Sequence, residues 1–309
     1  MPALITHHLF GEEAVSLLPE GIVSNQEEML SFLLGNQGPD PLFACFSTRP
    51  DVARACHQLA HAMHRSQVTE ALLALRDAVS HLPERDKTIG RAFALGMLGH
   101  YLLDSTAHPF VYAQQNAICE AGVGLEDAGG DVHAVIESDI DSWLLWAYRH
   151  QTVSEHPASL NLARTGRIER VAGAMVAQVA WQVFGLSIPA NAYGGAVGDY
   201  ELVYRVIDDG SGLRTDAIAL VERIFRSHSR AQALAHHDTT SDACAAANLS
   251  HHEWHDPYTG APSSESFPDL FFSALDRWEA MAESYVKGDA RALRAVTGKR
   301  NYDGEPTSE

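Results

Sequence analysis

The sequence predicts an all-α protein built as a single multi-helix domain. Apolar residues recur at helical spacing along most of the chain, and capping residues, glycines and prolines mark the ends of these segments. No stretch alternates with the two-residue period that a half-buried strand requires. We therefore expect one helical domain over residues 1–300 and a loose tail over residues 301–309.

Signals for helix ends divide the first third of the chain. Ser24 and Glu27 have the spacing of a capping box, and Gly35 follows the apolar residues of that helix as a stop signal. Pro50 can occupy the first turn of a second helix, because its missing N–H costs nothing there. Helices are expected over residues 24–35, 50–64 and 68–82.

A mostly apolar segment, residues 84–107, is expected to form the central helix. Pro109 should end it, because a proline disfavours α geometry in the preceding residue, His108. Residues 114–130 finish in a glycine-rich stretch and are expected to be a loop. Further helices are expected over 131–150, 168–184, 193–207, 213–235 and 267–287, with a polar, turn-rich loop over 236–268.

Composition argues against several classes of function. The 22 basic and 40 acidic residues give a net charge of −18, which opposes binding to nucleic acid. The amino terminus lacks the basic and apolar regions of a signal peptide, and the longest apolar run, residues 92–103, is too short to span a membrane. The four scattered cysteines form no CxxC pair, so we expect reduced thiols. These features predict a cytoplasmic protein without a transmembrane segment.

The segment HYLLDSTAH indicates a metal site. His100, Asp104 and His108 are spaced i, i+4 and i+8, and each step advances only ~40° around a helix, so the three side chains share one face. Gly96 on the same face would let another element or an ion approach the backbone closely. The alternative is a buried helix with hydrogen-bonded polar residues, but burying two imidazoles and a carboxylate without a metal demands many partners.

A second pair, His133 and Glu137, has the same i, i+4 spacing. Alone, it fits an ordinary contact on a helix surface equally well. Together with His108, however, the pair completes a three-ligand zinc set with an open position, as catalytic zinc sites require.

Two further segments offer ligands for another metal ion. Asp40 follows a Gly-Pro turn in GNQGPDPLF, and the helix HQLAHAMH presents three histidines on one face, of which we choose His64 over His61. The tandem His7 and His8 are the remaining candidates near the amino terminus, and one of the two could be a ligand.

Taken together, these segments resemble the zinc-dependent phospholipase C family. The resemblance rests on THHLFG, GNQGPDPLF, the histidine-bearing helix, GHYLLDSTAHP and HAVIES, and it covers about residues 2–150. That family includes secreted bacterial phosphatidylcholine-hydrolysing enzymes and the catalytic part of the clostridial alpha-toxin. The resemblance implies an all-α fold with a multinuclear zinc cleft between helices, and a phospholipid or related phosphate ester as substrate.

The resemblance also implies an assignment of ligands. One zinc would be held by Asp40, His64, His100 and Asp104, and a second by His108, His133 and Glu137. A third would lie between Asp104, His7 and the free amino end of the mature chain. The secreted enzymes begin with a tryptophan exposed by processing, whereas this chain begins Met-Pro. We therefore predict two zinc ions, with a third depending on this different terminus.

The implied chemistry is phosphodiester hydrolysis of the phospholipase C type. Paired zinc ions neutralise charge on the phosphate and lower the pKa of a bound water to ~7, and the resulting hydroxide attacks phosphorus in line. The resemblance implies that Asp40 is the catalytic residue, which would orient or deprotonate the water as well as bind metal.

Two alternatives remain open. The same metals could serve a soluble substrate, a nucleotide or small phosphate ester, since the architecture also resembles that of single-strand-specific zinc nucleases. Alternatively, the chain could be a non-enzymatic metal-binding protein in which fully coordinated zinc is structural. The sequence does not predict the oligomeric state.

Overall fold

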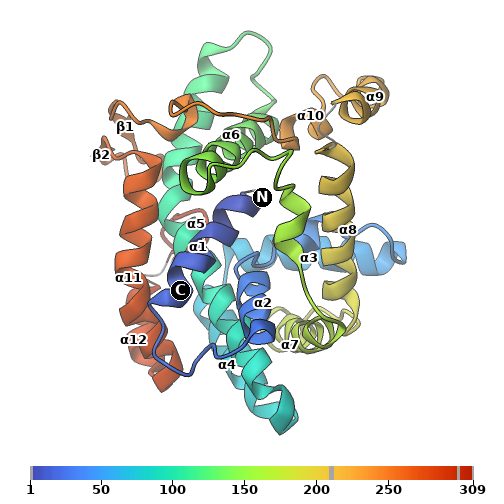
Figure 1. Cartoon of the computed structure of the whole chain (residues 1–309), viewed down its shortest axis with the longest axis vertical. Coiled ribbons are helices and arrows are strands. Elements are labelled where there is room, and N and C mark those ends of the chain that lie inside the picture. Colours follow the sequence, from blue (N-terminus) through green and yellow to red (C-terminus); the bar gives the residue numbers. More distant parts are fainter. Residues whose placement is uncertain (1–2, 209–211, 298–299, 308–309) are drawn as a thin grey trace. The chain divides into compact units, whose positions relative to one another are not determined.

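The computed structural model describes residues 3–208, 212–297 and 300–307, and within them the predicted all-α class is confirmed (Figure 1). A short antiparallel hairpin joins β1 (Trp254–His255) to β2 (Pro262–Ser263). The α-helices are α1 (Leu4–Ser16), α2 (Gln26–Gly35), α3 (Pro50–Arg65), α4 (Val68–His81), α5 (Lys87–Ala121), α6 (Gly129–Arg149), α7 (Gly166–Phe184), α8 (Ala192–Ile207), α9 (Leu213–Glu222), α10 (Arg230–Leu234), α11 (Phe267–Lys287) and α12 (Ala290–Val296). Short 3₁₀ helices are η1 (Asp40–Ala44), η2 (Glu84–Asp86), η3 (Ala158–Leu162) and η4 (Ala245–Ala247).

The internal contacts of the chain divide it into two compact units, which are described separately. Unit 1 comprises Met1–Thr6, Ala107–Asn161 and Glu201–Leu270, and unit 2 comprises His7–Thr106, Leu162–Tyr200 and Phe271–Glu309. A single domain over residues 1–300 stays a prediction. None of the described helices is long and apolar enough to cross a membrane.

Helix α5 differs from the helix predicted over residues 84–107. It begins at Lys87, passes through Pro109 and ends at Ala121, so part of the predicted loop over 114–130 is helical. An internal proline removes one backbone hydrogen bond and costs a helix ~3 kcal/mol. Phe110 and Val111, which follow it, are almost completely buried. The burial of these side chains stabilises the helix by more than Pro109 destabilises it.

Two other predicted boundaries were wrong. The helix predicted over 213–235 is divided into α9 and α10, because Ser229 caps a new helix by accepting a hydrogen bond from the N–H of Gln232. The predicted capping box is shifted by one residue. Asn25 accepts from the N–H of Glu28, and the carboxylate of Glu28 accepts from the N–H of Ser24.

The tail predicted to be loose is packed over the described residues 300–307. Asn301 and Tyr302 are both buried, and the N–H of Tyr302 donates to the carbonyl of His64 at 3.0 Å. The Tyr302 ring lies against Tyr101, with ring centroids 5.1 Å apart. The buried ring and this backbone hydrogen bond together fasten the segment to unit 2.

The cysteines are free thiols. Cys45 and Cys56 are buried, and Cys119 and Cys244 are half-buried. Burial raises the pKa of the Cys45 and Cys244 thiols and raises the pKa of Cys56 to about 12. These three side chains are therefore protonated and unreactive at neutral pH.

In unit 2, helices α2 and α5 cross in contact through two glycines. A Cβ atom on Gly96 would overlap the carbonyl oxygen of Phe32, and one on Gly35 would overlap the carbonyl oxygen of Phe93. Gly96 thus admits another helix, which is one of the two outcomes expected from its lack of a side chain. The crossing places the chain after α2, from Asn36 onward, directly against His100 of α5.

In unit 1, a buried network of charged side chains holds the start of α1. The carboxylate of Asp141 accepts hydrogen bonds from the N–H groups of Ile5 and Thr6 at 2.9 and 2.8 Å. His236 lies between Asp141 and Asp208, with ring nitrogens 3.0 and 2.8 Å from their carboxylates. A carboxylate at a helix N-terminus satisfies orphan N–H groups and interacts favourably with the helix dipole.

The substitution Gly96→Ala tests the crossing of α2 and α5. An alanine favours an isolated helix by about 1 kcal/mol, but here its methyl group meets backbone that cannot move away. We expect urea unfolding to show a net loss of about 2 kcal/mol in the free energy of unfolding. Gly195→Ala is the matched control, because its Cβ on α8 would face open space and should stabilise the chain slightly. Equal stability of the two variants would contradict the close crossing.

The charge on His236 predicts a pH dependence of stability. Burial opposes this charge, but the carboxylates of Asp208 and Asp141 outweigh burial and raise the pKa of His236 from 6.5 to about 10. The native chain therefore retains a proton that the unfolded chain has lost, so the stabilisation is complete below pH 6.5 and disappears as the pH rises through about 10. Urea unfolding below pH 6.5 and between pH 6.5 and about 10 should show the free energy of unfolding fall as the pH rises. This pH dependence should be weaker in His236→Gln and unchanged in His228→Gln.

Candidate metal centre

Three elements of unit 2 bring Asp40, His64 and His100 together as a buried group. Asp40 begins η1 two residues after Gly38, whose φ of +58° allows the sharp turn out of α2. His64 lies in the last turn of α3, and His100 lies in the middle of α5. The nearest donor atoms of the three side chains all lie within 4.8 Å of one another, which is close enough for a single ion to bind them.

Backbone carbonyls fix the orientation of both imidazole rings. His64 Nδ1 lies 2.8 Å from the carbonyl of Ala60, and His100 Nδ1 lies 3.0 Å from the carbonyl of Asn36. Because a carbonyl only accepts, each Nδ1 must carry the proton. In a neutral ring the lone pair is then on Nε2, the atom that faces the carboxylates. Histidine ligands of metals are commonly held in this way.

The Nε2 atoms face carboxylate oxygens without making a hydrogen bond to them. His64 Nε2 lies 3.1 Å from Asp40 Oδ1, and His100 Nε2 lies 3.1 Å from Asp104 Oδ2 and 4.0 Å from Asp40 Oδ1. Neither Nε2 has a hydrogen-bond partner, nor does Asp40 Oδ1. Leaving buried polar atoms unsatisfied is costly, whereas a cation bound among them would satisfy all three. The donor set therefore fits a metal ion.

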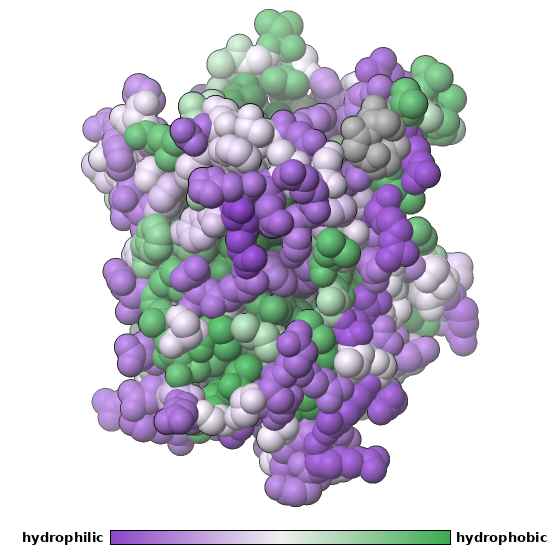
Figure 2. Space-filling model, in the orientation of Figure 1, coloured by the Kyte–Doolittle hydropathy of each residue, from purple (hydrophilic) through white to green (hydrophobic). Residues whose placement is uncertain are grey.

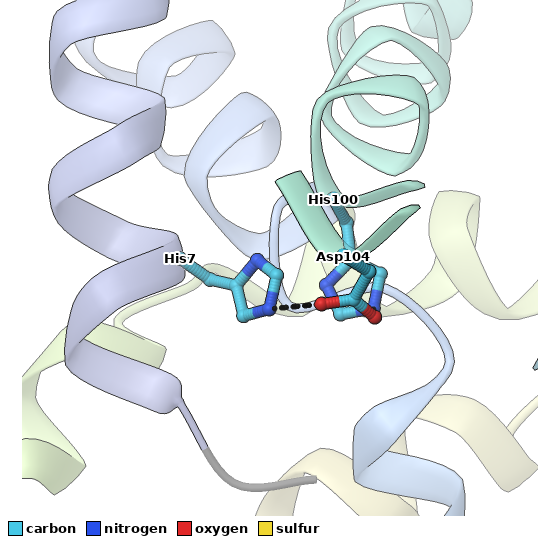
Figure 3. Close-up of side chains that lie close together, drawn as sticks. All are labelled: His7, His100 and Asp104. Atoms are coloured by element: carbon cyan, nitrogen blue, oxygen red, sulfur yellow. Dashed lines mark ion pairs between the residues drawn. The ribbon is translucent and has the colours of Figure 1, made fainter. Parts of the chain in front are cut away.

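His7, His100 and Asp104 form a second group in unit 2. Figure 3 shows His7 on α1 and Asp104 on α5 pointing toward each other. His7 Nε2 lies 3.0 Å from Asp104 Oδ1, and the His7 ring stacks on the His100 ring with centroids 4.0 Å apart. Asp104 thus directs one oxygen to each histidine, which is the arrangement that a bridging carboxylate needs.

The two groups share His100, which can bind only one ion. An imidazole with a protonated Nδ1 has a single lone pair, so an ion beside Asp40 and His64 would occupy His100 Nε2. The His7 group would then keep His7 Nε2 and one oxygen of Asp104, two protein ligands. Structural zinc takes four ligands and catalytic zinc at least three, so a zinc ion at His7 needs a donor from elsewhere.

The electrostatics of these groups favour ionised carboxylates. Burial opposes the charge on Asp40, but nearby positive charge, to which His64 and His100 contribute, outweighs burial and holds the pKa of Asp40 well below the usual range. Burial also opposes a charge on His100, but Asp104 and Asp40 raise its pKa. Burial and the neighbouring His100 lower the pKa of His7, which keeps that ring neutral and able to bind metal.

In unit 1, His108, His133 and Glu137 form the third group. His108 lies on α5, and the other two lie one turn apart on α6. Glu137 Oε1 lies 3.2 Å from His133 Nε2 and 3.4 Å from His108 Nε2. Burial opposes ionisation of Glu137, but nearby positive charge, to which His133 and His108 contribute, outweighs burial and keeps the pKa of Glu137 well below the usual range. An anionic carboxylate facing two imidazole nitrogens is a donor set that suits zinc.

Gln115 orients His133 from outside this group. Its side-chain oxygen lies 3.0 Å from His133 Nδ1, so this nitrogen donates and leaves the lone pair on Nε2, toward Glu137. Gln115 was not predicted from the sequence, although it follows His108 by seven residues, two turns along the same helix face. Asn36 was not predicted either, because it orients His100 through its backbone carbonyl, a group that every residue type has.

The structure places each of the eight predicted ligands in one of the three groups. Of the tandem histidines, His7 is buried, whereas His8 is partly exposed and pairs with Glu12 at 3.5 Å. On α3, His64 is in a group, whereas His61 is exposed and contacts the ring of Phe43. Whether these residues bind metal stays a prediction.

Comparison with known proteins identifies the family. Residues 6–177, more than half of the chain, match the family described as zinc-dependent phospholipase C. No match was found among curated proteins or among solved structures. The matched region contains every predicted ligand, and the family is all-α. The chain belongs to the zinc-dependent phospholipase C family.

Proposed function

We propose that the chain is a zinc-dependent phosphoric diester hydrolase of the phospholipase C type. The observation that carries the proposal is the arrangement of His64 and His100, whose fixed rings direct unsatisfied Nε2 lone pairs toward the buried carboxylates of Asp40 and Asp104. Membership of the family supports zinc as the ion and a phospholipid as the class of substrate.

The three groups suggest how the ligands divide. Asp40, His64, His100 and Asp104 would hold one zinc ion, and His108, His133 and Glu137 would hold another. His7 together with the second oxygen of Asp104 offers part of a third position. We propose two ions as the minimum, because the sharing of His100 leaves the His7 position two ligands short of a structural zinc site.

When bound, zinc supplies a Lewis acid that stabilises charge on the phosphate and lowers the pKa of water. The protein residues supply orientation and proton transfer. The carbonyls of Ala60 and Asn36 hold His64 and His100 in the tautomer that exposes Nε2. The hydrogen bond of Tyr193 to the carbonyl of Gly38, 2.8 Å long and buried, fixes the turn that leads to Asp40.

Asp40 is proposed to act as a base as well as a ligand. It is a buried carboxylate, and one of its oxygens, Oδ1, has no hydrogen-bond partner. A carboxylate with two oxygens can bind an ion through one and accept a proton from water through the other. The proton then leaves with the alcohol as the phosphodiester is cleaved.

The substitution Asp40→Asn separates these two roles. The amide keeps the shape of the side chain and one oxygen donor but cannot accept the proton. We expect most of the zinc to remain and the turnover number to fall about 10²–10⁴-fold. Asp51→Asn, on the exposed start of α3, is the matched control and should retain full turnover. Unchanged turnover in Asp40→Asn would refute the role as base.

Removal of metal tests the proposed function as a whole. Elemental analysis of the purified chain should find at least two zinc ions, and chelation should abolish the hydrolysis of phosphatidylcholine. Assays of a soluble phosphodiester alongside the lipid separate the alternatives. Chelator-sensitive cleavage of only the soluble ester would point to a soluble substrate, and bound zinc with no cleavage of either would point to a structural site. If chelation changed neither activity nor stability, the metal site itself would be wrong.

A further inference from the structure

Residues 300–306 form a closed loop in unit 2, which we call the 300–306 loop. An isolated antiparallel bridge joins Arg300 to Pro306. Inside it, the N–H of Asn301 donates to the carbonyl of Glu305 at 3.0 Å, and Asn301 Oδ1 accepts from the N–H of Glu305 at 2.9 Å. Because Asn301 is 1% exposed, its hydrogen bonds are shielded from competing water. The loop therefore has a defined conformation of its own.

Helix α5 holds one end of this loop. The hydroxyl of Tyr101 donates to the carbonyl of Thr297 at 2.6 Å and to that of Arg300 at 3.2 Å. Tyr101 follows His100 directly in the sequence, and both side chains are buried. The loop is thus fastened to α5 beside a residue of the candidate metal centre.

Helix α3 holds the loop at a second point, which is itself part of the metal centre. The carbonyl of His64 lies in the last turn of α3, where carbonyls have no partner within the helix. This carbonyl accepts the hydrogen bond from the N–H of Tyr302. The His64 ring is held by the carbonyl of Ala60, so Tyr302 fixes the backbone of the residue whose side chain Ala60 orients.

The ring of Tyr302 packs against both imidazoles that carry unsatisfied Nε2 atoms. Its centroid lies 5.0 Å from that of His64 and 5.6 Å from that of His100, so the three rings form one cluster. Not every aromatic residue of this chain is buried. Figure 2 shows hydrophobic residues on the surface over α9, at the upper right, and Phe225 after that helix is 82% exposed. Tyr302, in contrast, is 1% exposed, because it packs on the two histidines.

We propose that Tyr302 is a positioning residue for the ion bound by Asp40, His64 and His100. Its N–H fixes the end of α3 that carries His64, and its ring keeps both imidazoles in place and excludes water beside them. Groups that orient metal ligands in this way typically contribute about 10–100-fold to metal affinity or activity. The proposal rests on the proposed function in taking zinc as the ion.

Release of zinc from the purified chain into excess chelator tests this role without any need for turnover. In Tyr302→Leu, about one equivalent of zinc should leave about tenfold or more faster than in the wild type, because the ring that packs on the imidazoles is lost. The zinc proposed to be held by His108, His133 and Glu137 should leave at the wild-type rate. Tyr302→Phe keeps both the ring and the N–H and should release zinc much as the wild type does.

Cobalt(II) bound in place of zinc gives a second readout, because its visible absorption reports the geometry of the ligands. Tyr302→Leu should change this absorption. Asn301→Ala, which loosens the 300–306 loop without altering the ring, should change it in the same direction. Met175→Ala is the matched control, since Met175 is buried in α7 of unit 2 and α7 holds no predicted ligand. It should lower the stability of the chain but leave absorption and zinc release unchanged.

Three results would overturn the proposal. They are wild-type zinc release and absorption in both Tyr302→Leu and Asn301→Ala, equal acceleration of zinc release in Tyr302→Leu and Met175→Ala, and equal acceleration in Tyr302→Phe and Tyr302→Leu. The second would show a general loosening of unit 2, and the third would assign the effect to the hydroxyl. Faster release from Tyr302→Leu without chelator-sensitive hydrolysis by the wild type would refute the proposed function alone. Chelator-sensitive hydrolysis by the wild type, with unchanged zinc release and absorption in the variants, would refute positioning alone.

Discussion

The close crossing of α2 and α5 is the constraint on which the metal groups of unit 2 depend. Because Gly35 and Gly96 carry no side chains, the two helices meet backbone to backbone. The chain leaving α2 must then run along α5, where the carbonyl of Asn36 accepts a hydrogen bond from Nδ1 of His100. A Cβ on Gly38 would overlap that same ring, so this turn also needs a glycine. Three glycines, Gly35, Gly38 and Gly96, therefore fix the orientation of the His100 ring, although none of them has a side chain.

The parts of the site that lie within one helix could be predicted from the sequence. The spacing of His100 and Asp104 and that of His133 and Glu137 place each pair on one helix face. The approach of Asp40 to His64 depends on tertiary packing, and the family resemblance, rather than periodicity, pointed to it. The path of α5 through Pro109 and the packing of Tyr302 escaped prediction for the same reason, since burial of neighbouring side chains overrides a local preference.

Two buried clusters of histidine and carboxylate show how a salt bridge differs from a candidate metal site. His236 has a carboxylate acceptor at each ring nitrogen, so it is satisfied as an imidazolium and needs no ion. His100 has a carbonyl at one nitrogen and a carboxylate without hydrogen-bond geometry at the other. Both clusters combine the same residue types at similar burial. The distinction lies in where each ring must carry its proton, which neither composition nor spacing reveals.

The metal ligands of the three groups determine how the site responds to oxidation. All are imidazoles or carboxylates, and none is a thiolate. Zinc held by thiolates is released when those sulfurs are oxidised to disulfides, but nitrogen and oxygen ligands undergo no such reaction. The buried thiols of Cys45 and Cys56 remain protonated at neutral pH and therefore compete poorly for the metal. A metal centre of this composition is insensitive to the redox state of its surroundings, and its occupancy would follow the supply of zinc and the pH.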